Sequence, residues 1–253
     1  MRTRRIALAT FFAAHVLFAG GVAAQDGSYL RGAKTPTREG ARTSFFLGGA
    51  GWMLASACIL DHAIRQELAL APGAEPNPLA RAGTLIGEPG FFLSALGLTY
   101  GAGYLLGSDG LKEGAAHAAI ALLASGVANG ALKFGIGRCR PRAPCGGDDV
   151  RYFALDNAWQ SFPSGHTVVA FSLATSLSRK ANNRWVSLLA YAGAGMVGWS
   201  RIHHDRHWAS DVVAGAIVGT TTTVFTLDWL DGADDLPRLG ISPYGISVSI
   251  PSP

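Results

Sequence analysis

Six apolar segments without charged residues dominate this chain of 253 residues and limit what it can fold into. They are rich in Ala, Gly, Leu and Ser and lack the alternating β-branched pattern of strands, so we expect helices. Their small residues allow close helix packing in either lipid or water. The segments occupy residues 43–60, 89–108, 114–132, 157–178, 185–200 and 212–227. The sequence therefore predicts an all-α bundle of about six helices.

The relation of this bundle to a membrane is left open by the segment lengths. Hydrophobic residues make up 49% of the chain and charged residues 15%, a balance shifted toward membrane proteins. A spanning helix needs about 20 apolar residues, however, and the last two segments are shorter than that. We expect membrane association, with integral embedding as the alternative.

The first residues have the pattern of an export signal. Arg2, Arg4 and Arg5 form a positive start, an apolar stretch follows, and small residues at 22–24 fit a cleavage site. We predict a signal peptide at 1–24, and an uncleaved anchor is the alternative. Both place the chain in the export pathway.

The remaining chain divides by composition. Residues 25–42 are polar and basic and predict a flexible lead-in, and residues 43–228 hold the apolar segments of one domain. The tail 229–253 alternates near its end, which predicts a short strand or a hairpin. The net charge of +4 is small and scattered, so nucleic acid is not an expected partner.

Three clusters of reactive residues interrupt the apolar pattern. Their members are Lys133 with Arg140-Pro141, then Ser164-Gly165-His166, and finally Arg201, His207 and Asp211.

The cations of these clusters have the chemistry of a phosphate site. Phosphoryl transfer depends mainly on positioning and on stabilising charge spread over the phosphate oxygens. Lys133 and Arg140 are separated by two helical turns, so we expect them on one face of a helix. Arg201 is a third cation, and Ser164-Gly165 before an apolar helix offers a hydroxyl and backbone N–H groups.

Two histidines supply the reactive groups. His207 is followed four residues later by Asp211, whose carboxylate can fix the imidazole tautomer, so we expect His207 to attack phosphorus. His166, next to the Ser164-Gly165 turn, is expected to protonate the leaving oxygen.

The cysteines fit an oxidising compartment. Cys139 and Cys145 are close enough in sequence to form a loop disulfide, while three free thiols are an equally open interpretation. Cys58 lies in an apolar segment and is expected to be buried.

Together the three clusters resemble the type 2 phosphatidic acid phosphatase (PAP2) superfamily, which also contains class A acid phosphatases and vanadium haloperoxidases. The resemblance covers Lys133 to Asp211 and the helices at about 90–227. It implies that 43–228 is a phosphatase domain that cleaves phosphate monoesters, lipid phosphates above all, through a phosphohistidine intermediate, without metal or cofactor. It implies the following roles: His207 is the nucleophile, His166 the acid and Asp211 the orienting partner, while Lys133, Arg140, Ser164, Gly165 and Arg201 bind phosphate.

The number of apolar segments before Lys133 bears on the side of the membrane that holds the site. Three apolar segments precede Lys133, and if all three crossed a membrane the site would face the cytoplasm. We expect the glycine-containing segment 43–60 not to span, which places the site on the periplasmic side.

Three alternatives remain at the sequence level. His203, His207 and Asp211 have the spacing of metal ligands on one helix face, although neighbouring cations would repel a metal ion. A haloperoxidase with bound vanadate would use the same pocket. A non-catalytic envelope protein would need neither a nucleophile nor an acid. The sequence does not indicate an oligomeric state.

Overall fold

The computed structural model describes residues 36–71, 74–75, 77–145, 149–233, 238–242 and 245–249. The predicted signal peptide lies outside these ranges, as does the start of the predicted lead-in. The remainder of that lead-in is helical, because the first described helix begins at Pro36.

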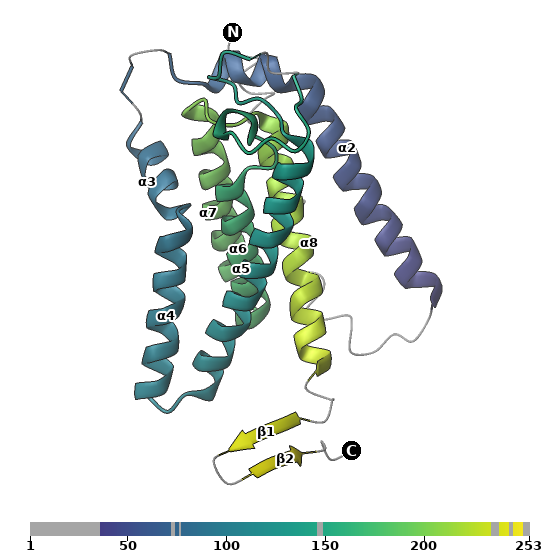
Figure 1. Cartoon of the computed structure of the whole chain (residues 1–253), viewed down its shortest axis with the longest axis vertical. Helices are drawn as coiled ribbons and strands as arrows, with labels where there is room; N and C mark the ends of the chain where they lie inside the picture. Colours follow the sequence, from purple (N-terminus) through teal and green to yellow (C-terminus); the bar gives the residue numbers. More distant parts are fainter. Residues whose placement is uncertain are drawn as a thin grey trace.

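Seven α-helices form a bundle in the described residues, and the all-α prediction is confirmed (Figure 1). A hairpin lies beyond the end of the bundle, with the strands β1 and β2 paired antiparallel. The helices are α2 (Pro36–Leu68), α3 (Pro78–Ile86), α4 (Pro89–Leu105), α5 (Asp109–Ile136), α6 (Gly165–Ala181), α7 (Arg184–His203) and α8 (Ala209–Ala233), and the strands are β1 (Arg238–Ser242) and β2 (Gly245–Ser249).

Helix α6 is the centre of the bundle and packs against α5, α7 and α8. Phe171, Tyr191 and Val197 form the core between α6 and α7. The contact between α6 and α8 depends on small residues, since a Cβ at Gly219 would lie 2.4 Å from the Val168 carbonyl oxygen. The predicted close packing of small residues is therefore present at this contact.

Two predicted boundaries are wrong. The stretch 61–88, which lies between the predicted helices 43–60 and 89–108, contains the end of α2 and all of α3. Helix α3 begins with Pro78 in its first turn, and the Asn77 side chain accepts a hydrogen bond from the Leu79 N–H at 2.9 Å. The predicted helix 157–178 begins only at Gly165, after a short 3₁₀ turn at Asn157–Trp159.

Two helices of the described chain are long and apolar enough to cross a membrane, 109–136 and 209–232. Only 17% of the apolar window in the first is buried inside the molecule, whereas 61% of the window in the second is buried. The second helix, α8, therefore also fits the core of the bundle, while α5 leaves large apolar side chains such as Leu123 and Val127 exposed.

The end of α5 and the starts of α6 and α8 meet at one end of the bundle, the upper end in Figure 1. The end of α7 lies at the same end. All three reactive clusters lie on these helix ends or on the loops between them.

Candidate active site

Helix α5 ends between the two cations of the first cluster. Gly137 has φ 57°, a left-handed conformation that stops the helix, and a Cβ there would lie 1.8 Å from the Arg151 carbonyl oxygen. The prediction that Lys133 and Arg140 share one helix face is therefore wrong. The loop after Gly137 brings Arg140 back to Lys133 instead.

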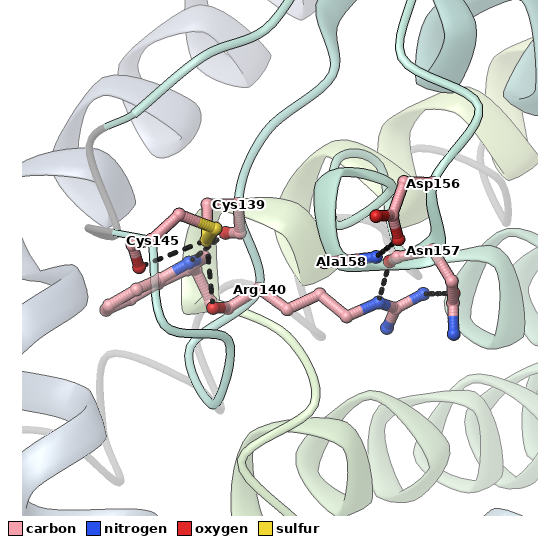
Figure 2. Close-up of a disulfide and its surroundings, with 7 residues drawn as sticks. Cys139, Arg140, Cys145, Asp156, Asn157 and Ala158 are labelled. Atoms are coloured by element: carbon pink, nitrogen blue, oxygen red, sulfur yellow. Dashed lines mark hydrogen bonds between the residues drawn. A yellow bond between two sulfur atoms is a disulfide. The ribbon is translucent and has the colours of Figure 1, made fainter.

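Both cations are held by backbone carbonyl groups. The Lys133 Nζ donates to the Gln160 carbonyl oxygen at 2.7 Å. The Arg140 Nε donates to the Asn157 carbonyl oxygen at 2.8 Å, and its Nη2 donates to the Asn157 Oδ1 at 3.0 Å (Figure 2). Its Nη1 donates to the Arg206 carbonyl oxygen at 3.2 Å. These contacts fix the guanidinium before any anion binds.

A disulfide closes the loop that carries Arg140. Cys139 and Cys145 are joined with their Cα atoms 6.1 Å apart, directly beside Arg140 (Figure 2). Cys58 is a free thiol and is exposed, so the expectation that it is buried is wrong. Helix α2 turns that position outward from the bundle.

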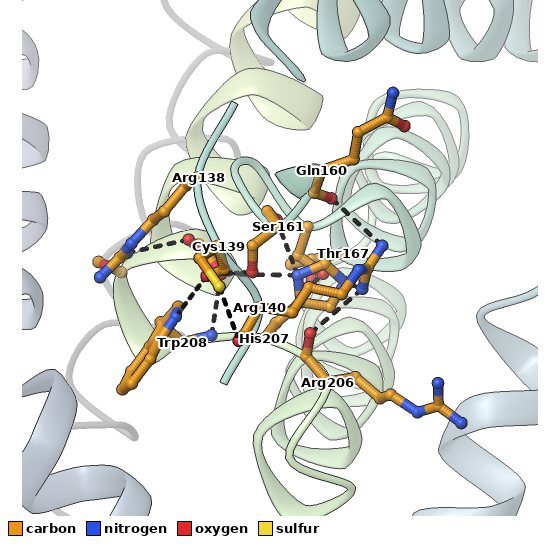
Figure 3. Close-up of polar contacts among 12 residues, drawn as sticks. Arg138, Cys139, Arg140, Gln160, Ser161, Thr167, Arg206, His207 and Trp208 are labelled. Atoms are coloured by element: carbon orange, nitrogen blue, oxygen red, sulfur yellow. Dashed lines mark hydrogen bonds and ion pairs between the residues drawn. The ribbon is translucent and has the colours of Figure 1, made fainter. Parts of the chain in front are cut away.

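His207 is buried, with its ring orientation set by backbone (Figure 3). Its Nδ1 lies 2.8 Å from the Ser161 carbonyl oxygen. A carbonyl oxygen only accepts hydrogen bonds, so Nδ1 carries the proton and Nε2 carries the lone pair. The Arg140 Nη1 lies 3.3 Å from Nε2 and donates toward it. The Nε2 lone pair thus points toward the cations and accepts from the Arg140 guanidinium.

Asp211 lies behind His207 rather than in direct hydrogen-bond contact with it. Its Oδ2 is 3.6 Å from the His207 Nδ1, beyond hydrogen-bond distance. That oxygen accepts from the Ser161 Oγ at 2.5 Å and from the Trp208 N–H at 2.9 Å. The predicted orienting role of Asp211 is therefore shared with the Ser161 carbonyl, which the sequence did not indicate.

The environment keeps His207 neutral. The pKa of His207 is lowered to about 4, mainly by burial; Asp211 opposes this lowering, and the charges of Lys133 and Arg140 add to it. An imidazole with this pKa is a free base near neutral pH, which a nucleophile requires.

His166 lies in the first turn of α6 and contacts an acidic residue that the sequence analysis missed. Its Nε2 lies 3.1 Å from an oxygen of Glu88, the residue before α4. Burial and then the charge of Arg201 lower the pKa of His166, and Glu88 opposes both. Glu88 lies between the apolar segments 43–60 and 89–108, where an isolated carboxylate gives no signal.

The two residues of the Ser164-Gly165 turn differ in their access to the pocket. Ser164 is fully buried and precedes α6; its N–H donates to the Asp211 carbonyl oxygen at 2.9 Å. Its hydroxyl accepts from the Thr167 Oγ1 at 3.0 Å. The hydroxyl of Ser164 is therefore engaged inside the bundle, and Gly165 alone of this pair lines the pocket.

Arg201 reaches the pocket from the last turn of α7. It is buried, and its Nη2 donates to the Thr84 Oγ1 of α3, while Nε donates to the Ser200 Oγ at 3.3 Å. Helix α3, absent from the predicted fold, thus positions one of the predicted phosphate ligands.

A pocket of about 640 Å³ joins these groups. It contains His207, His166, Lys133, Arg140, Gly165 and Arg201, whereas Ser164 and Asp211 lie behind its wall. Further lining residues are Arg81, Thr84, Leu85, Glu88, Asn157, His204 and Arg206. The pocket is strongly cationic and opens beside two histidines, an arrangement suited to an anion that undergoes proton transfer.

The geometry does not support the metal alternative. Helix α7 ends at His203 and α8 begins at Ala209, so His203, His207 and Asp211 do not share one helix face. The His203 Nδ1 instead contacts the Leu68 carbonyl oxygen at 3.0 Å. Within the described ranges, no three His, Cys, Asp or Glu side chains are grouped to hold a metal ion.

Comparison with known sequences gives two partial relatives. The chain is 40% identical over 99 residues to a lipid A 1-phosphatase of Porphyromonas gingivalis, covering 38% of this chain and 19% of that protein. It is 33% identical over 60 residues to an undecaprenyl-diphosphatase of Sulfolobus acidocaldarius, covering 24% of this chain and 29% of that protein. The matches thus span less than a third of the length of either relative.

Two crystal structures share the fold. Aquifex aeolicus LpxE superposes with a TM-score of 0.51 at 24% identity, covering 67% of this chain and 95% of that one. A transmembrane PAP2 type phosphatidylglycerolphosphate phosphatase from Bacillus subtilis superposes with a TM-score of 0.51 at 20% identity, covering 87% and 96%.

The family comparison coincides with the site. Residues 114–234 match the model of the PAP2 superfamily. This range contains Lys133, His166, His207 and the other members of the three clusters, which the fold gathers at one end of the bundle. Over residues 114–234, just under half of the chain, this protein is similar to the PAP2 superfamily.

Proposed function

We propose that this chain hydrolyses phosphate monoesters of lipids by transferring the phosphoryl group to Nε2 of His207. The observation that carries the proposal is the state of that nitrogen. Nε2 carries no proton, because Nδ1 donates to the Ser161 carbonyl oxygen, and its lone pair faces the Arg140 guanidinium at 3.3 Å. A neutral nucleophile beside fixed cations is what attack on a phosphate ester requires.

In the first step, Nε2 of His207 forms a bond to phosphorus while the bond from phosphorus to the ester oxygen breaks. Lys133, Arg140 and Arg201 stabilise the charge on the phosphate oxygens. His166 gives its proton to the leaving oxygen, and the lipid alcohol departs. Asp211 stabilises the positive charge that develops on the His207 ring.

In the second step, water attacks the phosphohistidine. His166, now neutral, takes a proton from that water, and the bond between phosphorus and Nε2 breaks. Inorganic phosphate leaves, and His207 returns to its neutral tautomer. His166 recovers the proton that it gave in the first step.

The choice of a lipid substrate has two supports. The apolar surface of α5 is largely exposed, with 17% of its most apolar window buried, which fits contact with lipid. The two sequence relatives are named for lipid phosphates or diphosphates.

The predicted export signal and the Cys139–Cys145 disulfide support a site on the periplasmic side.

No metal or cofactor enters this mechanism. The groups that would stabilise phosphate charge are side chains, and the cations that line the pocket disfavour a bound metal ion. We therefore expect activity to persist in the presence of a chelator.

The experiment that tests this function measures inorganic phosphate released by the purified full chain. A panel of lipid phosphates in detergent micelles is compared with soluble phosphomonoesters of similar leaving groups, with His207→Gln as the inactive control. We expect release from the lipid panel at a higher kcat/KM and none from the variant. Release from soluble esters alone would contradict the lipid assignment, and equal release by the variant would contradict the role of His207.

A further inference from the structure

Helix α2 lies outside the segment 114–234 that matches the family, yet it holds the turn that carries His207. The Arg65 Nε and Nη2 donate to the two carboxylate oxygens of Asp205 at 2.7 and 2.9 Å. The Leu70 N–H donates to the His203 carbonyl oxygen at 2.8 Å. The end of α2 therefore fixes the chain on the N-terminal side of His207.

Asp61, one turn before Arg65, fixes the other side of the same turn. It is 2% exposed, and its Oδ1 accepts from the Ser210 N–H at 2.8 Å. Its Oδ2 accepts from the Arg138 Nη2 at 2.9 Å and from the Ser210 hydroxyl. Burial raises the pKa of Asp61, and hydrogen bonds from Ser210 and Arg138 oppose that rise. The carboxylate thus depends on these two partners for its charge.

Arg138 connects Asp61 to the nucleophile. Its Nη1 donates to the Asp211 Oδ1 at 3.0 Å, and its side chain is 14% exposed. The other oxygen of Asp211 lies 3.6 Å from the His207 Nδ1. Asp61, Arg138 and Asp211 therefore form a row of alternating charges, and the Asp211 carboxylate ends this row behind the imidazole ring of His207.

We infer that Asp61 is a positioning residue for His207, supplied by a helix outside the family segment. Its carboxylate shares the Arg138 charge, so Arg138 does not fully neutralise Asp211. The three groups together leave one negative charge facing the ring on which positive charge develops during phosphoryl transfer. Its bonds to Ser210 also hold the start of α8, from which Asp211 projects. This inference rests on the proposed function of His207.

The kinetic test compares two variants of α2 in the purified full chain. Asp61→Asn keeps the shape and removes the charge. Arg65→Gln is the matched control, because it removes an ion pair to the same turn without contacting Arg138 or Asp211. We expect kcat of Asp61→Asn to fall about 10- to 100-fold with KM changed less than about twofold, by analogy with the loss when the outer partner of a metal-binding histidine is removed. Asp61→Glu should recover part of kcat.

A second readout needs no substrate and separates this inference from the proposed function. NMR of ¹⁵N-histidine-labelled protein in micelles follows the titration of His207, assigned with His207→Gln. The charged groups that face His207 are Asp211, Lys133 and Arg140, and they are the same in all variants. Removing one negative charge should lower the pKa of His207 in Asp61→Asn, while Arg65→Gln should leave it in place.

The two readouts give distinct outcomes. Equal kinetic losses in both variants with an unmoved His207 titration would overturn the inference and leave Asp61 a purely structural anchor. An unchanged kcat in a folded Asp61→Asn would also overturn it. Absence of phosphate release by the unaltered chain, with the His207 titration shifted as expected, would instead overturn the proposed function alone.

Discussion

At the scale of single residues, the proposed chemistry depends on two hydrogen-bond partners that no motif specifies. The Ser161 carbonyl sets the tautomer of His207 at 2.8 Å, and the Glu88 carboxylate contacts His166 at 3.1 Å. The sequence supplied the reactive side chains, but a backbone carbonyl and a distant carboxylate become partners only through the fold. The sequence therefore indicates which side chains are candidates for the site, but not the partners that set their protonation states.

The division of labour between the histidines gives a first prediction. His207→Ala should abolish turnover of every ester, because no nucleophile remains. His166→Ala should lose about 10²- to 10⁴-fold on alkyl phosphates, the contribution typical of a general acid, and far less on aryl phosphates, whose leaving groups need no proton. Steady-state kcat on paired alkyl and aryl substrates measures this. Equal losses on the two substrates would contradict the role of His166.

The pKa shifts give a second prediction, for kcat/KM against pH. His207 must be neutral to attack, and its pKa is about 4, so activity should fall as pH drops through about 4. His166 must be protonated, and its pKa lies below the ordinary value of 6.5, so activity should also fall as pH rises toward neutrality. We expect a bell-shaped profile with an acidic optimum.

A substitution of Glu88 tests whether the alkaline limb of that pH profile is the titration of His166. Its charge raises the pKa of His166, so Glu88→Gln should move the alkaline limb to lower pH and leave the acid limb in place. Glu75→Gln is the matched control, since Glu75 pairs with Arg81 beside the pocket and does not contact His166. A shift of the acid limb in Glu88→Gln would contradict the assignment.

At the scale of elements, the end of α5 decides how the first cluster is built. Gly137 has φ 57° and lies against the Arg151 carbonyl, so the chain turns there and Arg140 comes from a loop. A sequence spacing of seven residues is equally compatible with a continuous helix.

A third prediction follows for this turn. Gly137→Ala should destabilise the protein by at least about 1–2 kcal/mol, because a left-handed conformation disfavours a Cβ and that atom would meet a carbonyl oxygen. A fall in Tm of at least about 3 °C is expected. Gly130→Ala is the matched control on the same helix, where a Cβ meets nothing within 4 Å, and should be neutral or stabilising. Equal Tm values for the two variants would contradict this account of the turn.

The helices that the sequence predicted are long and apolar, whereas the element and the contact that it missed depend on packing between distant segments. Long apolar segments such as 114–132 and 212–227 became α5 and α8, because they are longer than strands and lack the alternating β-branched pattern. Helix α3 was missed because its nine residues follow several prolines, and its stability comes from packing on α7. The contact of α2 with the His207 turn was also missed, because ion pairs between distant segments leave no periodic pattern.

At the scale of the whole molecule, the site lies where α5 ends and α8 begins, at one end of the bundle (Figure 1). If these two helices cross a membrane, they run in opposite directions and place the pocket at one face. The Cys139–Cys145 loop lies at the same end as the pocket. Whether these cysteines face the outside of the cell therefore indicates on which side of the membrane the pocket lies.

A fourth prediction concerns that side. An impermeant thiol reagent applied to spheroplasts of an expressing bacterium, after mild reduction, should label Cys139 or Cys145. The labelling is done in a chain that carries Cys58→Ser, because Cys58 is a free, exposed thiol that would otherwise react. Labelling only after lysis would place the pocket in the cytoplasm and contradict the periplasmic proposal.

The central claim is a covalent phosphoryl intermediate on His207, and the stereochemical course at phosphorus tests it most directly. The substrate carries a phosphate made chiral with three oxygen isotopes on a good leaving group, and the acceptor is an added alcohol in place of water. Two successive in-line displacements, first by His207 and then by the acceptor, each invert phosphorus, so we expect net retention of configuration. Net inversion would mean that the acceptor attacks the ester directly, and it would contradict the account.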